Sequence, residues 1–181
     1  MLFRSFPSHD NDEKLAISET TDGKPPRPGF ENASAPAPIG SNGQHEAYWV
    51  LSEEDRAKGF VRPVRRSYLH VGRAVCGKIK PPSSGQLSGV IHVCSDTPGH
   101  SGECWHQTIG VSQPEAAKAE QTQLLGGCGT KTTMGQALAE TYARDPSYYG
   151  ATFCCHCGNH PRVGEYGEFI WDDGSGERVG T

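Results

Sequence analysis

Cysteine and histidine residues carry the chemistry that this sequence offers. The segment 153–160 reads FCCHCGNH, in which Cys154 and Cys157 have C-x-x-C spacing and Gly158 follows directly. Two cysteines at this spacing reach one metal ion from a tight turn, and zinc takes four such ligands in a tetrahedron. The glycine lets the backbone turn so that amide groups face the sulfur atoms. The sequence therefore predicts half of a zinc site at Cys154 and Cys157.

The other half of that site has to come from elsewhere in the chain. Cys128 stands between two glycines, just before a segment with helical features, and we predict it as the third ligand. A histidine completes the set, and His70, His156 and His160 are all candidates. His70 is favoured because it ends a strand-like segment and precedes a glycine, and His160 is the alternative fourth ligand.

These cysteines also have interpretations that need no metal. Cys154 and Cys157 have the spacing of a redox dithiol, although such a pair usually begins a helix. Cys155 is interpreted as a buried thiol neighbour, and an inert core thiol is the alternative for Cys128. Metal is preferred because seven cysteines cannot all pair within one chain. The sequence also shows no apolar run typical of a signal peptide, so we expect a reducing compartment, where disulfides rarely persist.

A second group of ligand-type residues lies in the middle of the chain. The segment 93–106 (VCSDTPGHSGECWH) contains Cys94, His100 and Cys104, and Cys76 lies upstream. We predict a second candidate metal site at Cys76, Cys94, His100 and Cys104. The spacing matches no standard finger, so a set of metal-free thiols on a hairpin is the alternative.

Catalytic motifs are absent from the sequence. A zinc deaminase needs H-x-E and then P-C-x-x-C, and neither motif occurs. His45 and Glu46 begin an H-E-x-x-H pattern that lacks its second histidine, and there is no G-x-S-x-G or P-loop motif. Asp172 and Asp173 are interpreted as an acidic turn. We therefore predict no enzymatic activity, no catalytic residues and no small-molecule substrate.

Charge is distributed unevenly along the chain. Residues 56–80 carry eight basic residues and no acidic one, and they lie between the acidic segments 1–55 and 163–181. With Phe60 and Tyr68 interleaved, this stretch has features of a surface that follows a phosphate backbone. The net charge of −4 lacks the overall footprint of a nucleic-acid binder. Nucleic-acid binding through 56–80 is therefore the alternative, and neutralisation by the protein's own acids is preferred.

The elements that must position the ligands are short. Only 34% of the residues are hydrophobic, and the 23 glycines and 13 prolines leave little material for a large core. Residues 1–45 predict an extended or disordered arm rich in proline and glycine. Residues 46–181 predict a zinc-stabilised domain, in which 73–125 is an insertion-like hairpin and short helix. No stretch of eighteen apolar residues occurs, so no membrane partner is expected.

The predicted fold class is α+β, a small zinc-ribbon-like domain of short antiparallel strands plus one main helix. Strands are expected at 67–72, 88–95 and 104–111. A short helix should follow Ser52, and a capping box at Ser112 should begin a helix that continues to residue 125. The main helix should start from a capping box at Thr133–Gln136 and end before Pro146.

The C-terminal third carries a resemblance to a known group of proteins. Residues 127–181 (GCGTKTTMGQALAETYARDPSYYGATFCCHCGNHPRVGEYGEFIWDDGSGERVGT), with FVRPVRRSYLHVG at 60–72, resemble short, mostly uncharacterised proteins of tailed phages and prophages. The family pattern of His-Val-Gly, Gly-Cys-Gly-Thr and C-x-x-C matches at His70, Cys128, Cys154 and Cys157. The resemblance therefore ranks His70 above His160.

This resemblance implies a non-enzymatic, zinc-stabilised structural or interaction protein of a tailed phage. We expect it in the virion, as a capsid-decorating, head-stabilising or connector component, and in the host cytoplasm during assembly. Its partners would then be protein subunits of the particle, which an extended arm is suited to wrap. The alternative is a zinc-ribbon nucleic-acid-binding or regulatory protein in the host cytoplasm.

Overall fold

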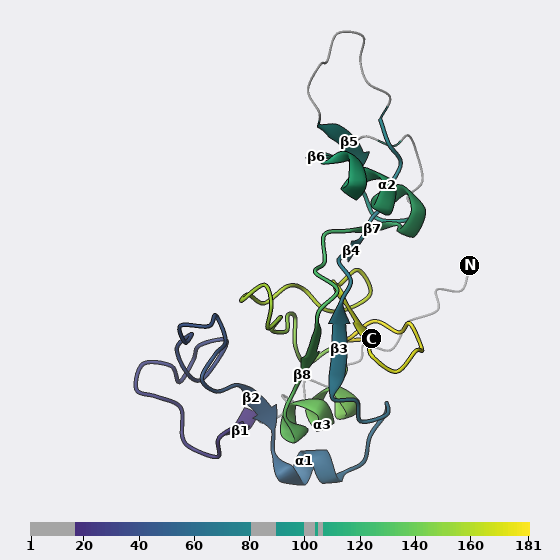
Figure 1. Cartoon of the computed structure of the whole chain (residues 1–181). Coiled ribbons are helices and arrows are strands. Elements are labelled where there is room, and N and C mark those ends of the chain that lie inside the picture. The colour runs from purple at the N-terminus through teal and green to yellow at the C-terminus, as the bar shows by residue number, and fades with distance from the viewer. Residues whose placement is uncertain (1–16, 81–89, 100–103, 105–106) are drawn as a thin grey trace, which may run out of the picture.

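A computed structural model describes residues 17–80, 90–99, 104 and 107–181, which form a small α+β structure with short antiparallel strands and few helices (Figure 1). The predicted α+β class is confirmed at this level. The elements in chain order are β1 (Ile17–Thr20), β2 (Trp49–Leu51), α1 (Glu53–Ala57), β3 (Ser67–His70), β4 (Arg73–Ala74), β5 (Ile91–Cys94), β6 (Thr108–Val111), α2 (Gln113–Thr122), β7 (Leu124–Leu125), β8 (Lys131–Thr133), α3 (Gln136–Arg144) and β9 (Phe169–Trp171).

A three-stranded antiparallel sheet forms the centre of the molecule. Its order is β8-β3-β9, so β3 lies in the middle, with Tyr68 opposite Thr132 on one side and Trp171 on the other. Side chains alternate between the two faces of a strand, and in β3 this places the side chains of Tyr68 and His70 in the interior. The central strand therefore carries a core aromatic and a predicted ligand on the same face.

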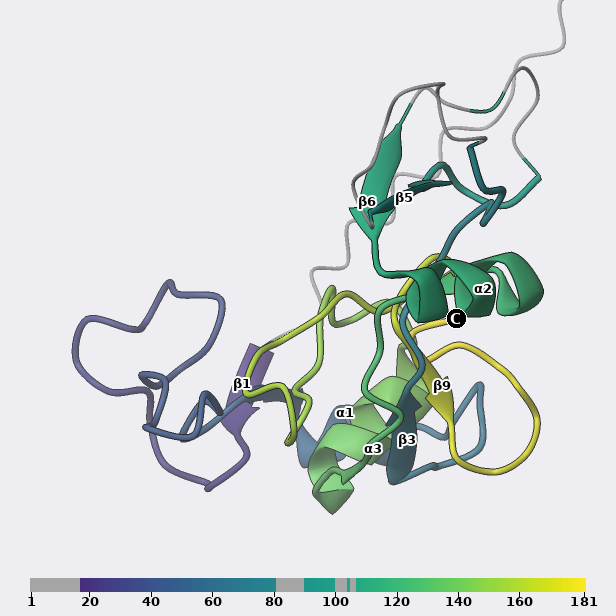
Figure 2. The ribbon, with the colours of Figure 1, turned by 45° about the horizontal axis from the view of Figure 1, so that its top comes forward.

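The main hydrophobic core lies between this sheet and α3, which runs beside β3 and β9 (Figure 2). Its aromatic members pack edge to face, as Tyr68 does with Phe169 at 5.2 Å between ring centroids. The buried set includes one predicted ligand, Cys154, so the candidate site is built into the edge of the core. The buried members are Tyr68, Met134, Ala139, Tyr142, Cys154, Phe169, Trp171 and Val179.

Local sequence signals place the helix starts in two of three cases. Ser52 caps α1 by accepting a hydrogen bond from the backbone N–H of Asp55, and Ser112 and Glu115 form the predicted capping box of α2. The expected capping box at Thr133 is wrong. Thr133 belongs to β8, where it pairs with Ser67, and α3 begins after Gly135.

The end of α2 also differs from the expectation. The helix was expected to continue to residue 125, but it ends at Thr122 with Gln123 in the left-handed conformation (φ 53°). Leu124 and Leu125 then form β7, which pairs with β4. Strand pairing with a distant segment therefore removes the last predicted turn of the helix. The main helix α3 ends at Arg144, as the following Asp-Pro pair predicted.

Residues 17–45, which belong to the expected N-terminal arm, pack against the body of the protein. Strand β1 pairs with β2 in an antiparallel ladder, and Ile39 and His45 form an isolated bridge. Ala35 and Ala37 are buried. Outside β1 the described part of the arm consists mostly of turns and bends, and β1 is fixed to the body by backbone hydrogen bonds to β2. Residues 1–16 lie outside the described part of the chain.

The described residues between 73 and 125 form a second packed unit with its own core. The antiparallel pair β4–β7 links this unit to β3 and β8, and the β5–β6 hairpin packs with α2 beyond it (Figure 1). The hairpin over a long loop was predicted, and β5 and β6 confirm it. Buried members of this core are Val75, Val93, Ala116, Ala119 and Leu125.

Among the described helices, none combines the length and the apolar composition that a membrane span needs.

Candidate metal centre

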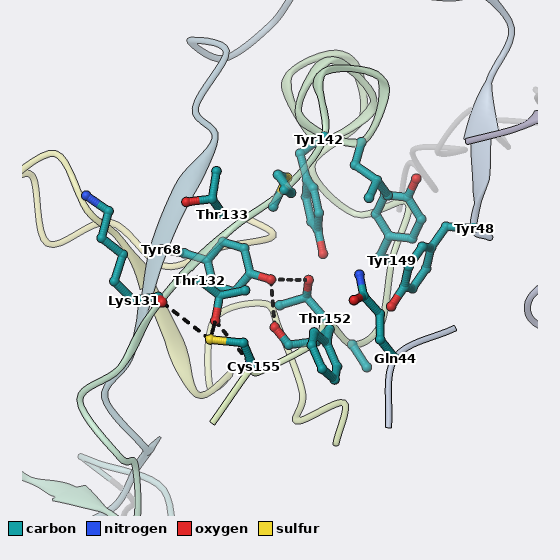
Figure 3. A pocket seen from close by; sticks show the side chains of 15 residues that line it. Gln44, Tyr48, Tyr68, Lys131, Thr132, Thr133, Tyr142, Tyr149, Thr152 and Cys155 are labelled. Carbon is teal, nitrogen blue, oxygen red and sulfur yellow. Dashed lines mark hydrogen bonds between the residues drawn. The ribbon is translucent and has the colours of Figure 1, made fainter. Parts of the chain in front are cut away.

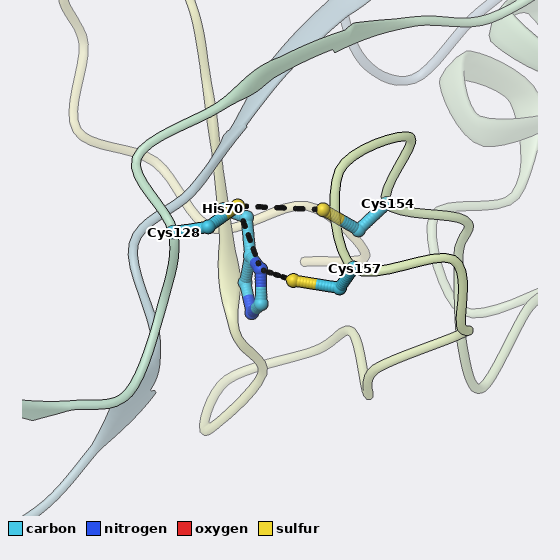
Figure 4. Close-up of side chains that lie close together, drawn as sticks. All are labelled: His70, Cys128, Cys154 and Cys157. Carbon is cyan, nitrogen blue, oxygen red and sulfur yellow. Dashed lines mark hydrogen bonds between the residues drawn. The ribbon is translucent and has the colours of Figure 1, made fainter.

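Four ligand-type side chains converge at the edge of the main core. One ligand atom each from His70, Cys128, Cys154 and Cys157 lies within 4.8 Å of the other three. Figure 4 shows these side chains reaching toward one another from separate segments, with Cys154 and Cys157 on one turn. These are the four residues that the sequence analysis placed in its first site. Such a group could hold a metal ion.

His70 is fixed on both sides of its ring. Its Nε2 atom lies 3.0 Å from Oε2 of Glu168, and its Nδ1 atom lies 3.4 Å from the sulfur atoms of both Cys128 and Cys157. The ring also packs on Phe169, with centroids 4.8 Å apart. In the tautomer with the proton on Nε2, the ring donates to the carboxylate and presents the Nδ1 lone pair to the thiols. A carboxylate in this position orients a ligating histidine and raises its basicity.

Cys128 is held beside His70 by the backbone of its loop. The N–H of Gly129 donates to the carbonyl of His70 (2.8 Å), and the N–H of His70 donates to the carbonyl of Thr130 (3.2 Å). Gly127 has φ 80°, and a Cβ atom there would lie 2.2 Å from the backbone carbon of Val71. Only glycine allows this close approach of the two segments. The glycine before Cys128 therefore determines where its thiol points.

Cys154 and Cys157 lie on a tight turn, residues 154–158, which is called the knuckle turn below and is closed by backbone hydrogen bonds. The N–H of Gly158 donates to the carbonyl of Cys154, and the N–H of Cys154 donates to the carbonyl of Asn159, both at 2.9 Å. Gly158 has φ 64°, a left-handed conformation that favours glycine, and the backbone turns there as the sequence predicted. Cys154 is buried and Cys157 is exposed. One thiol therefore faces the core while the other reaches the same point from the surface.

The crowded thiols ionise unequally. For Cys128, burial opposes ionisation, but hydrogen bonds from Thr130, Cys154 and His70 outweigh it and lower the pKa of the thiol to about 6. For Cys157, burial and the neighbouring thiols Cys154 and Cys128 raise the pKa to about 12. One negative charge forms easily in this group, and further charges need a cation to balance them.

The remaining candidates of the first site lie away from this point. The Nε2 atom of His160 lies 3.0 Å from the Tyr48 hydroxyl, and its ring packs on His45. His156 is exposed. Cys155 was interpreted as a buried thiol, which is wrong: it is exposed, and its sulfur accepts a hydrogen bond from the Thr132 hydroxyl at 3.3 Å. The Cys155 side chain therefore contacts β8 and lies outside the group that contains Cys154 and Cys157.

Three residues of the second predicted site also come together. Sulfur atoms of Cys76, Cys94 and Cys104 lie within 4.8 Å of one another. His100, the fourth residue of that prediction, lies outside the described residues. The second group is separate from the first, because it belongs to the unit formed by residues 73–125.

The basic stretch 56–80 makes ion pairs within the chain. The Arg56 guanidinium lies 3.0 Å from the Glu140 carboxylate and also pairs with Glu19. Arg65 pairs with Asp173 at 2.6 Å and with Glu177, both from the acidic C-terminal segment. Intramolecular neutralisation therefore accounts for these two cations. Asp173 lies in an acidic turn, as interpreted from the sequence.

A cavity of about 210 Å³ lies between the knuckle turn and α3 (Figure 3). Hydroxyl groups line much of it, and that of Tyr68 donates to the carbonyl of Phe153 at 2.6 Å. The Tyr142 hydroxyl is buried and has no hydrogen-bond partner among the described residues. Cys155 lines this cavity, whereas Cys154 and Cys157 are not among its lining residues.

Glu168 is the functional residue that the sequence analysis missed. It lies 98 positions from His70, and no local motif links the two. The register of β3 and β9 places His70 opposite Phe169, so the preceding residue comes next to the imidazole. Only the pairing of these strands reveals the contact.

Comparisons with known proteins add no assignment. No protein-family model matches the chain, and no characterised protein and no solved structure matches it either. The resemblance to phage proteins therefore remains an expectation from the sequence, and the geometry of the candidate metal centre carries the functional argument.

Proposed function

We propose that this protein is a non-enzymatic structural or interaction protein whose fold is stabilised by zinc at His70, Cys128, Cys154 and Cys157. The observation that carries the proposal is the convergence of four ligand atoms within 4.8 Å. Three thiols and one imidazole form a Cys3His set, which is a known composition of structural zinc sites.

The distances within the group fit a tetrahedral zinc ion. With Zn–S of about 2.3 Å and Zn–N of about 2.0–2.1 Å, a regular tetrahedron has S–S edges of about 3.8 Å and S–N edges of about 3.6 Å. Cys128 and Cys154 have their sulfur atoms 3.5 Å apart, and both S–N distances to His70 are 3.4 Å. A small expansion of the group would accommodate the ion.

The number of ligands supports a structural role. A catalytic zinc ion keeps one coordination position open for water or substrate, whereas a structural ion has four protein ligands. A site of this kind contributes roughly 10 kcal/mol or more to folding in small domains. That contribution suits a chain whose core is small, because the ion joins β3, the Cys128 loop and the knuckle turn. The knuckle and the adjoining sheet together support the zinc-ribbon-like description.

Association with a tailed-phage particle is the biological setting that we propose. The sequence resemblance motivates it, and one surface feature supports a protein partner. Phe60 and Val61 are consecutive and expose 46% and 62% of their surface, on a loop that Ala143 holds by accepting two backbone hydrogen bonds. Apolar side chains held at the surface in this way suit burial against another protein.

Nucleic-acid binding through residues 56–80 is less well supported. Arg56 and Arg65 make ion pairs within the chain, so they are not available as independent phosphate contacts. Binding that persists at low salt and falls steeply as salt rises would favour this alternative over the structural role.

The zinc proposal is tested by the metal content of protein purified without chelators. Cys157→Ser should lose one zinc ion per chain, whereas Cys155→Ser, which changes the neighbouring thiol outside the group, should lose none. Equal zinc content in the two variants would contradict the proposal.

The proposed association with a tailed-phage particle is tested by mass spectrometry of particles purified from the phage or prophage whose genome encodes this protein. The protein should be present, and a Phe60→Ser, Val61→Ser double variant should be incorporated less while it keeps its zinc. Absence of the wild-type protein from the particles would reject a virion role.

A further inference from the structure

The unit formed by the described residues between 73 and 125 contains a cluster of three cysteine thiols that is separate from the first candidate zinc site. Cys76, Cys94 and Cys104 come from three different segments, and their sulfur atoms lie within 4.8 Å of one another. Cys94 is fully buried, and Cys76 and Cys104 are half-buried. Three thiols from separate segments at one point are a constellation that soft metal ions bind.

Backbone hydrogen bonds fix the first two of these cysteines. The N–H of Gly77 donates to the carbonyl of Cys94 at 3.1 Å, and the N–H of Cys94 donates to the carbonyl of Lys78 at 2.8 Å. The segment 76–80 therefore runs antiparallel to β5, and Ile79 and Val93 form an isolated bridge between them. Gly77 has φ 76°, and a Cβ atom there would lie 2.3 Å from the carbonyl oxygen of Ala119 in α2. This turn is pressed against the helix, which determines the position of the Cys76 thiol.

The sulfur separation shows that Cys76 and Cys104 form no disulfide in this structure. Cys76 and Cys104 have their sulfur atoms 3.7 Å apart, whereas a disulfide bond measures about 2.0 Å. The observed distance matches the S–S edge of about 3.8 Å that two thiolates have around one zinc ion. A disulfide would also leave the third thiol of the group without a role.

An acidic side chain adjoins the same thiols. The Cys94 thiol donates a hydrogen bond to Oδ2 of Asp96 at 3.1 Å. This contact holds the carboxylate beside the three thiols, and its negative charge adds to the attraction of the cluster for a divalent cation.

We propose that Cys76, Cys94 and Cys104 are three ligands of a second zinc ion, which stabilises the unit formed by residues 73–125. This ion is independent of the first, because the unit has its own hydrophobic core and is joined to the central sheet through β4 and β7. Each of the two hydrophobic cores in the described part of the chain would then have a metal ion at its edge.

Native mass spectrometry of the full chain, purified without chelators, tests this proposal. We expect two zinc ions in the wild type, one in Cys104→Ser, one in Cys157→Ser and two in Cys155→Ser. A wild type with one ion that is lost in Cys157→Ser and kept in Cys104→Ser would overturn the second site and leave the proposed function standing. A wild type with one ion that is kept in Cys157→Ser and lost in Cys104→Ser would reject the first site and support the second. Two ions retained in Cys104→Ser would also overturn the proposal.

Alkylation of the unmutated protein gives a second measurement that needs no variant to fold. In the zinc-loaded chain, the exposed Cys155 should react fast, while Cys76 and Cys104 should be protected. Removal of zinc by a chelator should make both reactive. Modification of Cys76 and Cys104 in the zinc-loaded chain at the rate of Cys155 would overturn the second site.

Discussion

The carboxylate of Glu168 lies 3.0 Å from Nε2 of His70, on the side of the imidazole away from the three thiols. The imidazole thereby contacts a carboxylate with one nitrogen and two sulfur atoms with the other. A partner of this kind fixes the tautomer of a ligating histidine and its orientation. It determines which nitrogen is available to a metal ion, so Glu168 is a positioning residue of the first site.

Glu168→Gln should therefore weaken zinc binding without removing a ligand. Loss of an outer partner of this type typically lowers metal affinity about 10- to 100-fold. Competition with a chromophoric chelator measures the change, and Glu165→Gln, an exposed acid nearby, is the matched control. Equal affinities for the two variants would show that the carboxylate does not support the ligand.

The residues of the first site were predictable where the signal was local. Cys154, Cys157 and Gly158 lie within one turn, and the glycines beside Cys128 mark a close approach of two segments. The choice of His70 over His160 depended on its place at the end of a strand-like segment, before a glycine, and on a resemblance. In the structure, strand β3 brings His70 to the thiols, while His160 contacts Tyr48.

Features that depend on distant pairing were not predictable. Thr133 has the sequence of a helix cap, but pairing with Ser67 places it in a strand. Leu124 and Leu125 continue a helical pattern, yet they pair with β4. In each case hydrogen bonds to a segment at least 50 positions away outweigh a local preference. Glu168 was missed for the same reason.

Gly43 should tolerate no side chain, because the arm passes directly over the knuckle turn. A Cβ atom on Gly43 would lie 1.8 Å from the carbonyl oxygen of Gly158. Gly29 also has positive φ, at 90°, but an added Cβ there meets nothing within 4 Å. Gly29→Ala therefore measures the backbone strain alone, about 1–2 kcal/mol. Gly43→Ala should cost about 1–3 kcal/mol more, from overpacking.

Denaturant unfolding of the two glycine variants gives these free energies. Limited proteolysis of Gly43→Ala should also cut within residues 17–46 faster than in Gly29→Ala, because relief of the clash displaces the arm. Equal loss of stability in both variants would mean that the arm does not rest on the turn.

Two buried tyrosines should respond in opposite ways to loss of the hydroxyl group. The Tyr68 hydroxyl donates to the carbonyl of Phe153, so Tyr68→Phe leaves a buried acceptor without its donor and should cost about 1–3 kcal/mol. The Tyr142 hydroxyl has no partner among the described residues, so Tyr142→Phe should leave stability unchanged or raise it slightly. Urea unfolding measures both. A similar cost for the two substitutions would contradict the assignment of the hydrogen bond.

Alkaline pH should remove part of the stability that Tyr68 contributes. Burial raises the pKa of Tyr68 from 10.0 to about 12 in the folded state, so folding favours the neutral phenol. This contribution is complete below pH 10 and is lost as pH rises from 10 to about 12, because only the unfolded chain ionises in that window. The advantage of the wild type over Tyr68→Phe should shrink by roughly 1.4 kcal/mol per pH unit above pH 10. Urea unfolding of both proteins at pH 8, 10 and 11 measures this difference, in which the other tyrosines cancel, and a constant difference across the series would place the phenol in contact with solvent.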